Sequence, residues 1–158
     1  MCLVSDPEKA LAWLQKSAQL EPANAMLHYH IAELLTEHTA SQPDLCRPAI
    51  NYLDSSINLM DSSNAFWDSA HLMRGNCYSR LGLPGEALAN YSKALEKRSD
   101  NPEAYYRRGV ALWRFGELDH AKADLSKAVT LSQCRNNPYS VLFEAALAGL
   151  QRGEPPPL

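Results

Sequence analysis

The chain has 158 residues, which is enough for one domain with a buried core. Its formal charge of -3 argues against a general nucleic-acid binder, which is usually strongly basic. Apolar residues make up 46% of the sequence, but no apolar stretch approaches the length of a membrane span.

Three amphipathic helical patterns come first in the chain. Residues 7–20 carry apolar side chains at helical spacing, among them Leu11 and Leu14, and predict one helix. Residues 24–38 and 46–60 predict an antiparallel pair, with the small residues Ala32 and Ala49 at the contact between them. The stretch TASQPDLCRP makes their connection longer than the connections that follow, so we expect an inserted loop there.

The next four predicted helices form two units that repeat at a fixed interval. We predict helices over 64–81, 85–97, 102–115 and 118–131, the first of them lengthened by a turn. Residues 34 positions apart match, and the pairs are Gly75 with Gly109, Gly82 with Gly116, Ala87 with Ala121, Tyr91 with Leu125 and Ala94 with Ala128. Small side chains let two helix backbones approach closely, and Gly82 and Gly116 suit the left-handed residue that ends a helix.

The last predicted helix covers residues 137–151. It begins like a further unit, but Phe143 replaces the small residue of the earlier units, which is typical of a terminal capping helix. The remaining residues, 153–158, read GEPPPL and are expected to form a disordered proline-rich tail.

This pattern resembles the tetratricopeptide repeat. The residues that carry the resemblance are Gly75-x-x-Tyr78, Gly82 and Ala87-x-x-x-Tyr91-x-x-Ala94, then Gly109-x-x-Leu112, Gly116 and Ala121-x-x-x-Leu125-x-x-Ala128. The resemblance implies an all-α fold, a right-handed α-solenoid of helix-turn-helix repeats with about eight helices and a C-terminal capping helix. We assign residues 1–152 to this domain, with a partial repeat at 7–22, repeats at about 25–63, 68–101 and 102–135, and the capping helix at 137–151.

The resemblance also implies a concave face, lined by the first helix of each unit, that binds a peptide or helix of another protein. Counted from the glycine position, the expected lining residues are Tyr29, Glu33, Leu72, Asn76, Arg80, Tyr106, Arg107, Val110, Trp113 and Arg114. Arginine binds carboxylates bidentately, and Tyr and Trp are favoured anchors, so an acidic peptide is the expected ligand. A solvated arginine face is the alternative interpretation.

One branch of this family, the co-chaperones of cytosolic heat-shock proteins, holds a C-terminal carboxylate with a clamp of Lys, Asn, Asn, Lys and Arg. Arg107 matches the clamp arginine, whereas Tyr29, Glu33, Met73 and Glu103 stand at the other four positions. Two of these residues would place a carboxylate against the carboxylate of the ligand, so the sequence argues against an intact clamp.

The sequence contains no pattern typical of catalysis, such as a Gly-rich phosphate loop, Gly-x-Ser-x-Gly or His-Glu-x-x-His. His38 and Cys46 flank the inserted loop, but two ligands do not make a zinc site. The four cysteines show no Cys-x-x-Cys spacing and suit a reducing compartment. We therefore expect a cytoplasmic, non-catalytic scaffold or adaptor without cofactor or metal, and without nucleic-acid or membrane partners.

Two alternatives stay open at this stage. The helix over 7–20 has no first helix of its own, so another chain could cover its apolar side at Leu11 and Leu14. The protein would then be a structural subunit that self-associates or completes a larger complex. RNA binding by helical repeats of similar length is disfavoured, because residues 1–64 hold three Lys or Arg against eight Asp or Glu.

Overall fold

The computed structural model describes residues 7–134 and 137–157, without the side chains of residues 7–10 and Cys134. Residues 1–6 of the expected domain and Leu158 of the expected tail lie outside this description. Within it the chain forms eight α-helices, one short 3-10 helix and no strand, which confirms the all-α class. The elements are α1 (Pro7–Leu20), α2 (Ala25–His38), η1 (Pro43–Leu45), α3 (Cys46–Leu59), α4 (Trp67–Arg80), α5 (Pro84–Lys97), α6 (Pro102–Arg114), α7 (Leu118–Cys134) and α8 (Ser140–Gln151).

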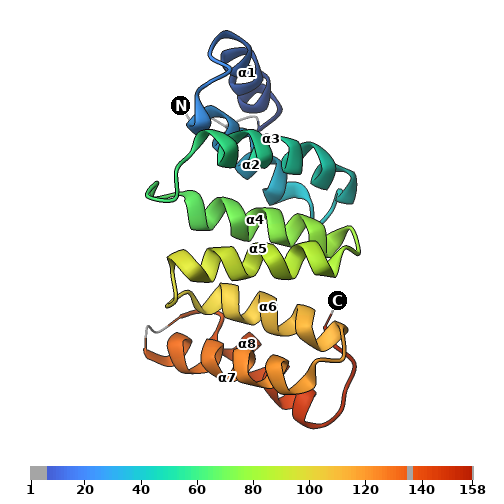
Figure 1. Cartoon of the computed structure of the whole chain (residues 1–158). Helices are drawn as coiled ribbons and strands as arrows, with labels where there is room; N and C mark the ends of the chain where they lie inside the picture. The colour runs from blue at the N-terminus through green and yellow to red at the C-terminus, as the bar shows by residue number, and fades with distance from the viewer. Residues whose placement is uncertain (1–6, 135–136, 158) are drawn as a thin grey trace, which may run out of the picture.

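The helices form one elongated stack in chain order, from α1 at the top of Figure 1 to α7 and α8 at the bottom. Each helix packs against the helices that precede and follow it in the chain, and the tightest pairs are α2 with α3, α4 with α5 and α6 with α7. The core is therefore a row of small apolar clusters between successive helices rather than one central core. The first helix of each pair also has a side that its partner helix does not cover, and we call these sides together the lateral surface.

Glycine sits where the paired helices approach most closely. A Cβ atom built on Gly75 in α4 would lie 2.6 Å from Cε1 of Tyr91 in α5, a separation that real Cβ atoms do not tolerate. A Cβ atom on Gly109 in α6 would lie 3.0 Å from Cγ of Leu125 in α7. The alanines at the predicted contact positions, Ala32, Ala49, Ala87, Ala94, Ala121 and Ala128, are at most 1% exposed. Close backbone packing thus explains the small residues that repeat through the sequence.

The ends of α4 and α6 have the predicted left-handed glycines. Gly82 has a φ of 72° and Gly116 a φ of 82°, values that glycine adopts without strain. At each end, two backbone N–H groups beyond the helix donate hydrogen bonds to carbonyls of its last turn. After α6, the N–H of Gly116 donates to the carbonyl of Trp113 at 3.0 Å, and that of Glu117 donates to the carbonyl of Leu112 at 3.0 Å. These are Schellman motifs, which turn the chain sharply into the next helix.

The predicted start of the fourth helix is wrong. The sequence predicted a helix over 64–81, extended by a turn, whereas α4 begins at Trp67. The reason is side-chain capping, because Asp61 Oδ1 accepts from the backbone N–H of Ser63 at 2.7 Å, and Asn64 Oδ1 accepts from that of Phe66 at 2.9 Å. Such bonds compete with helix formation, so the additional residues form two turns instead.

Candidate functional site

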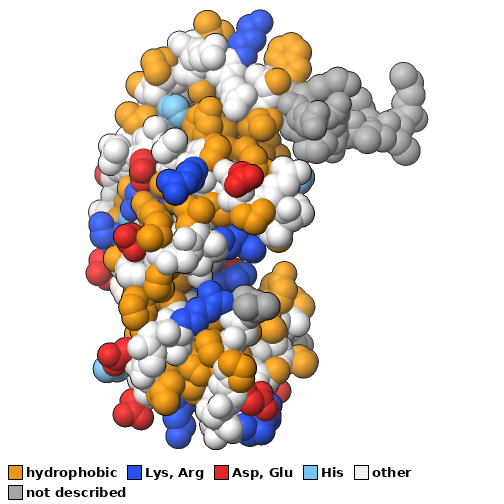
Figure 2. All heavy atoms as spheres, turned by 90° about the vertical axis from the view of Figure 1, so that its right-hand side faces the viewer, with side chains coloured by type: hydrophobic (Ala, Val, Ile, Leu, Met, Phe, Trp, Pro, Cys, Tyr) orange, Lys and Arg blue, Asp and Glu red, His pale blue; other side chains and the backbone are white. Residues whose placement is uncertain are grey.

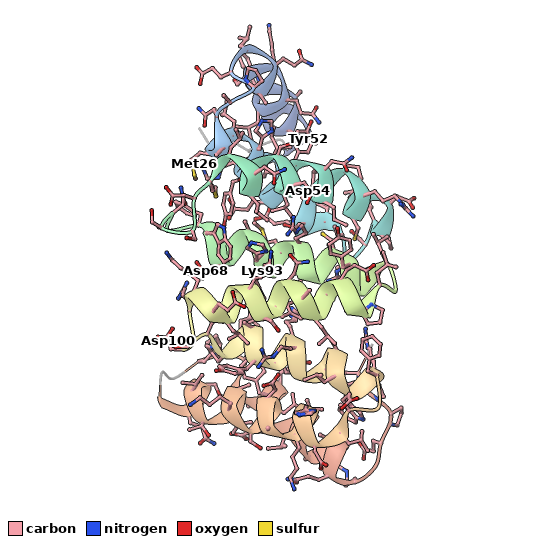
Figure 3. The ribbon with its side chains drawn as sticks, viewed as in Figure 1. Met26, Tyr52, Asp54, Asp68, Lys93 and Asp100 are labelled. Atoms are coloured by element: carbon pink, nitrogen blue, oxygen red, sulfur yellow. The ribbon has the colours of Figure 1, made fainter. Side chains whose placement is uncertain are left out.

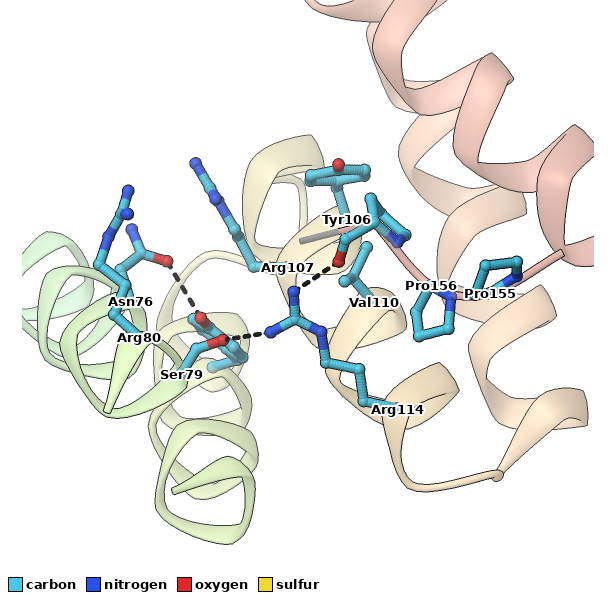
Figure 4. A pocket seen from close by; sticks show the side chains of 11 residues that line it. Asn76, Ser79, Arg80, Tyr106, Arg107, Val110, Arg114, Pro155 and Pro156 are labelled. Atoms are coloured by element: carbon cyan, nitrogen blue, oxygen red, sulfur yellow. Dashed lines mark hydrogen bonds between the residues drawn. The ribbon is translucent and has the colours of Figure 1, made fainter. Parts of the chain in front are cut away.

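A groove of about 510 Å³ opens on the lateral surface between α4 and α6. Figure 2 shows the hollow near the middle of this face, with Lys and Arg side chains gathered beside it. Its walls come from two first helices, its floor includes a tyrosine of α5, and part of its rim comes from the segment after α8 (Figure 4). The lining residues are Asn76, Ser79, Arg80, Tyr91, Tyr106, Arg107, Val110, Arg114, Pro155, Pro156 and Pro157.

Three guanidinium groups give the groove a positive charge. Arg107 lies 3.3 Å from Oε1 of Glu103 through two of its nitrogens, and this carboxylate is one turn away on the same helix. Arg114 reaches across the groove and donates to Oγ of Ser79 at 3.4 Å. Among the described residues, no acceptor lies within hydrogen-bonding distance of the Arg80 side chain, and none of the described lining residues is acidic. Positive charge at the groove is therefore only partly compensated.

The floor of the groove is aromatic and polar. The Tyr91 hydroxyl donates to Oδ1 of Asn76 at 3.0 Å, and burial raises the pKa of Tyr91 to about 12. Tyr106 stacks on Phe143 of α8 with ring centroids 4.8 Å apart, and burial also raises its pKa. Both hydroxyl groups stay protonated at neutral pH, so the floor is neutral and the charge lies on the walls.

The groove brings together six of the ten expected lining residues. These six are Asn76, Arg80, Tyr106, Arg107, Val110 and Arg114. Tyr106 lines the groove but is only 7% exposed. Its stacking on Phe143 of α8 accounts for this burial.

The other four expected residues lie elsewhere. Tyr29 is 5% exposed and packs against Phe66, and Glu33 faces the His30 ring nitrogen at 3.2 Å on the surface of α2. Leu72 packs against the small core formed by Ala87, Tyr91 and Ala111. Trp113 is 7% exposed, and its ring packs against α8, 3.3 Å from the Cβ position of Gly149. All four lie on the first helix of a pair, but neighbours cover Tyr29, Leu72 and Trp113, and Glu33 pairs with His30.

The segment after α8, for which the sequence predicted a disordered tail, reaches the groove. The structure describes residues 153–157, and they run back along the molecule to the end of α6 (Figure 1). Pro155, Pro156 and Pro157 line the groove, and the Arg114 guanidinium donates to the carbonyl of Pro157. Sequence reasoning missed these residues together with Ser79 and Tyr91, although Ser79 follows Asn76 by three positions and thus shares its helix face.

The described histidines and cysteines have contacts that do not involve a metal ion. His38 Nδ1 lies 3.0 Å from the carbonyl of Leu34, and Cys46 is buried beside Cys77 rather than beside His38. Burial raises the pKa of Cys77 to about 12, so this thiol stays protonated and packs as a small apolar residue. Within the described ranges no three His, Cys, Asp or Glu side chains are placed to hold a metal ion.

A second polar cluster is buried between α3, α4 and α5 and has a structural explanation. Arg74 donates to Oδ1 of Asn90 at 2.9 Å and pairs with Asp54 at 2.5 Å. Figure 3 labels Asp54 on α3. His71 Nδ1 also lies 3.0 Å from Oδ1 of Asn90, and burial lowers the pKa of His71. These contacts tie three successive helices together inside the stack, away from the groove.

Two models of the same repeat match the chain, described as TPR repeat over residues 75–116 and as tetratricopeptide repeat over residues 102–133. Residues 75–133 of the chain are therefore tetratricopeptide repeats. Proteins of this family generally mediate protein–protein interactions, and their fold is generally a non-catalytic module. None of the helices described here is long and apolar enough to cross a membrane.

The curated relatives align with this chain over part of their own length. A TPR repeat-containing protein of Methanocaldococcus jannaschii, MJ1428, is 26% identical over 154 residues, which cover 90% of this chain and 25% of the relative. The chain spans about a quarter or less of the length of the curated relatives it matches.

Solved structures show the same fold at lower identity. The crystal structure of MamA aligns with a TM-score of 0.70 at 15% identity, and covers 94% of this chain and 90% of MamA. A complex of the TPR2AB domain of yeast Sti1 with an HSP90 peptide aligns with a TM-score of 0.66 at 18% identity, and covers 94% of this chain and 64% of that one.

Proposed function

We propose that the chain is a non-catalytic scaffold or adaptor module, working in the cytoplasm, that binds an acidic peptide segment of a partner protein in the groove between α4 and α6. The observation that carries this proposal is the convergence of Arg80, Arg107 and Arg114 on one groove with no acidic residue among its described lining. A solvated arginine face would not need to converge on a hollow with an aromatic floor. The Sti1 neighbour, which holds a peptide, supports the choice of ligand.

The proposed ligand differs from the carboxylate of a heat-shock C-terminus. Glu33 lies on α2 and is paired with His30, and Glu103 is paired with Arg107 on α6. Both carboxylates stand where the clamp needs an amide or an ammonium group. The proposed contacts are therefore carboxylate side chains of the partner at Arg80 and Arg107, which Figure 4 shows on the side away from Pro155 and Pro156.

The test is a titration by fluorescence anisotropy with a fluorescein-labelled peptide in which Asp and Glu alternate with Ala. The double variant Arg80→Glu/Arg107→Glu should weaken binding about tenfold or more, since tenfold corresponds to about 1.4 kcal/mol and each reversal replaces attraction by repulsion. High salt should weaken it too, because screening shortens the reach of exposed charges to about 3 Å at 1 M.

The matched control is Lys122→Glu/Lys127→Glu, which makes the same charge change on exposed positions of α7. If the control variant loses as much affinity as the groove variant, binding reflects net charge alone and the groove is not the site. A peptide with Asn and Gln in place of Asp and Glu should not bind. Circular dichroism of each variant verifies that helix content is unchanged.

A second candidate function is self-association, and exposed apolar side chains at both ends of the stack favour it. Leu11 and Leu14, expected to be uncovered, pack against the core between α1, α2 and α3. The exposed residues are instead Trp13, which is 72% exposed in α1, and Val141, which is 73% exposed in α8. Light scattering of the wild type and of Trp13→Glu/Val141→Glu tests this: a monomer at high concentration in both cases rules it out.

A further inference from the structure

The groove of this protein is already partly filled by its own chain. Pro155, Pro156 and Pro157 line it from the side opposite Arg80, as Figure 4 shows for the first two. Pro156 and Pro157 are partly buried there, although they follow the last helix and would be solvated in a free tail. This segment is the one peptide-like occupant of the groove that the described residues provide.

Local structure holds the segment in this place. Gly153 has a φ of 70°, and its N–H donates to the carbonyl of Leu150 at 3.1 Å while that of Glu154 donates to Gly149 at 3.0 Å. This is a third Schellman motif, and it turns the chain away from the axis of α8. Glu154 then forms a two-pronged ion pair with Arg152, with nitrogen–oxygen distances of 2.5 and 3.0 Å. Both features fix the direction in which the prolines leave the helix.

The groove and the proline segment are chemically complementary. Three successive prolines favour an extended conformation, have no N–H group to satisfy and leave their carbonyls as acceptors. The groove offers the Tyr106 ring and Val110 for proline rings, and the Arg114 guanidinium donates to the Pro157 carbonyl. A second nitrogen of the same guanidinium bonds Ser79 on the facing helix, so Arg114 is oriented toward the segment.

We propose that the groove selects an extended proline-containing peptide, and that residues 155–157 occupy it as an intramolecular competitor of the partner. The proposal rests on the proposed function, because it names the conformation of the ligand and a regulation of the same site. The internal segment engages Arg114 through a neutral carbonyl, whereas Arg80 lies on the facing helix α4 and Arg107 lies two turns before Arg114 on α6. A partner peptide that adds carboxylates to its prolines engages all three arginines and therefore displaces the segment.

The strength of the competition follows from tethering. A segment linked to its site by a few residues acts at an effective concentration in the millimolar range. A free peptide that binds the empty groove with a dissociation constant of about 0.1 mM would then bind the occupied groove about tenfold more weakly. This factor is large enough to measure by NMR titration of the full chain.

The experiment compares the wild type with Pro155→Ser/Pro156→Ser/Pro157→Ser, a full-length variant that leaves every helix unchanged. The probe is the synthetic peptide Gly-Glu-Pro-Pro-Pro-Leu, capped at both ends and added to 15N-labelled protein. We expect saturable shifts of the amides of Arg107, Val110 and Arg114 in the variant, with about tenfold higher affinity than in the wild type. A peptide with Ala in place of the three prolines should bind at least about tenfold more weakly.

Each other outcome overturns the proposal. Equal affinity of the proline peptide for wild type and variant means that the segment does not compete. Equal affinity of the proline and alanine peptides means that the groove does not select proline. If the proline peptide does not bind while the peptide of Asp and Glu alternating with Ala still binds, the proposed function holds and the selection of proline is wrong. If neither peptide binds the folded variant, both are wrong.

Discussion

Replacing Gly75 by alanine tests the physical reason for the repeat. On an ordinary helix, Gly→Ala stabilises by about 1 kcal/mol, because alanine has the higher helix propensity. Here the new methyl group would meet ring carbons of Tyr91 at 2.6 and 2.8 Å. Tyr91 is 1% exposed, so its ring cannot swing into solvent, and moving it stretches the hydrogen bond to Asn76. The contact therefore opposes the propensity.

The magnitude can be estimated from these contacts. Overpacking a close-packed core costs about 1–3 kcal/mol, and losing a hydrogen bond costs about 0.5–1.5 kcal/mol. Against a gain of about 1 kcal/mol, Gly75→Ala should lower the free energy of unfolding by about 1–3 kcal/mol. In Gly109→Ala the methyl group meets Leu125 Cγ at 3.0 Å, a milder contact that should leave stability within about 1 kcal/mol of the wild type.

Urea unfolding followed by far-ultraviolet circular dichroism provides the measurement. Gly85→Ala is the matched control, because Gly85 lies in α5, has no positive φ and has no atom within 4 Å of its Cβ position. It should raise stability by about 0.4–1 kcal/mol. If Gly75→Ala were as stabilising as Gly85→Ala, the close approach of α4 and α5 would not be the reason for this glycine.

Three further variants probe the buried histidine, the capping helix and the turn before the tail. Burial lowers the pKa of His71 from its ordinary value of 6.5, so below pH 6.5 the unfolded chain binds more protons than the folded protein, and the free energy of unfolding should fall as the pH drops through this window. His71→Gln should flatten that part of a plot of urea midpoint against pH. An unchanged slope would contradict the assignment. Phe143→Ala removes a ring that is 1% exposed and should lower the free energy of unfolding, measured by thermal denaturation, by about 3–5 kcal/mol. A loss below about 1 kcal/mol would be inconsistent with the packing of this ring. Gly153→Ala forces alanine to a φ near 70°, at a cost of about 1 kcal/mol. The amide hydrogen of Glu154 should therefore exchange with solvent about fivefold faster than in the wild type. An unchanged exchange rate would mean that other contacts hold the turn.

The sequence predicted the helices well because the information for them is local. A glycine or alanine at the closest contacts of the paired helices and a glycine after α4 and α6 leave few other ways to pack the chain. The start of α4 was wrong because two short polar side chains, on Asp61 and Asn64, bind backbone N–H groups and end the helical pattern early. Capping of this kind depends on a few atoms, so periodicity alone does not detect it.

The groove was predictable only in part, because burial depends on neighbours that are remote in sequence. Arg107 and Arg114 were identified from their place on α6, since charged side chains seldom find a place inside. Trp113 was expected on the same face but packs under α8, and Tyr106 is covered by Phe143. The capping helix was itself predicted, but its angle to α6 was not, and that angle decides which aromatic side chains remain open.

Tyr91 shows how closely the framework and the groove are joined. One edge of its ring fills the space that Gly75 leaves, and its hydroxyl group holds Asn76 on the groove wall. A repeat that relied on a larger residue at position 75 would push this ring, and with it the polar floor, toward the ligand. The same close approach that stacks α4 on α5 therefore sets the depth of the groove, while the arginines on the wall are free to vary without disturbing the stack. In this protein the glycine contacts determine the shape of the site, and the exposed side chains around it determine its charge.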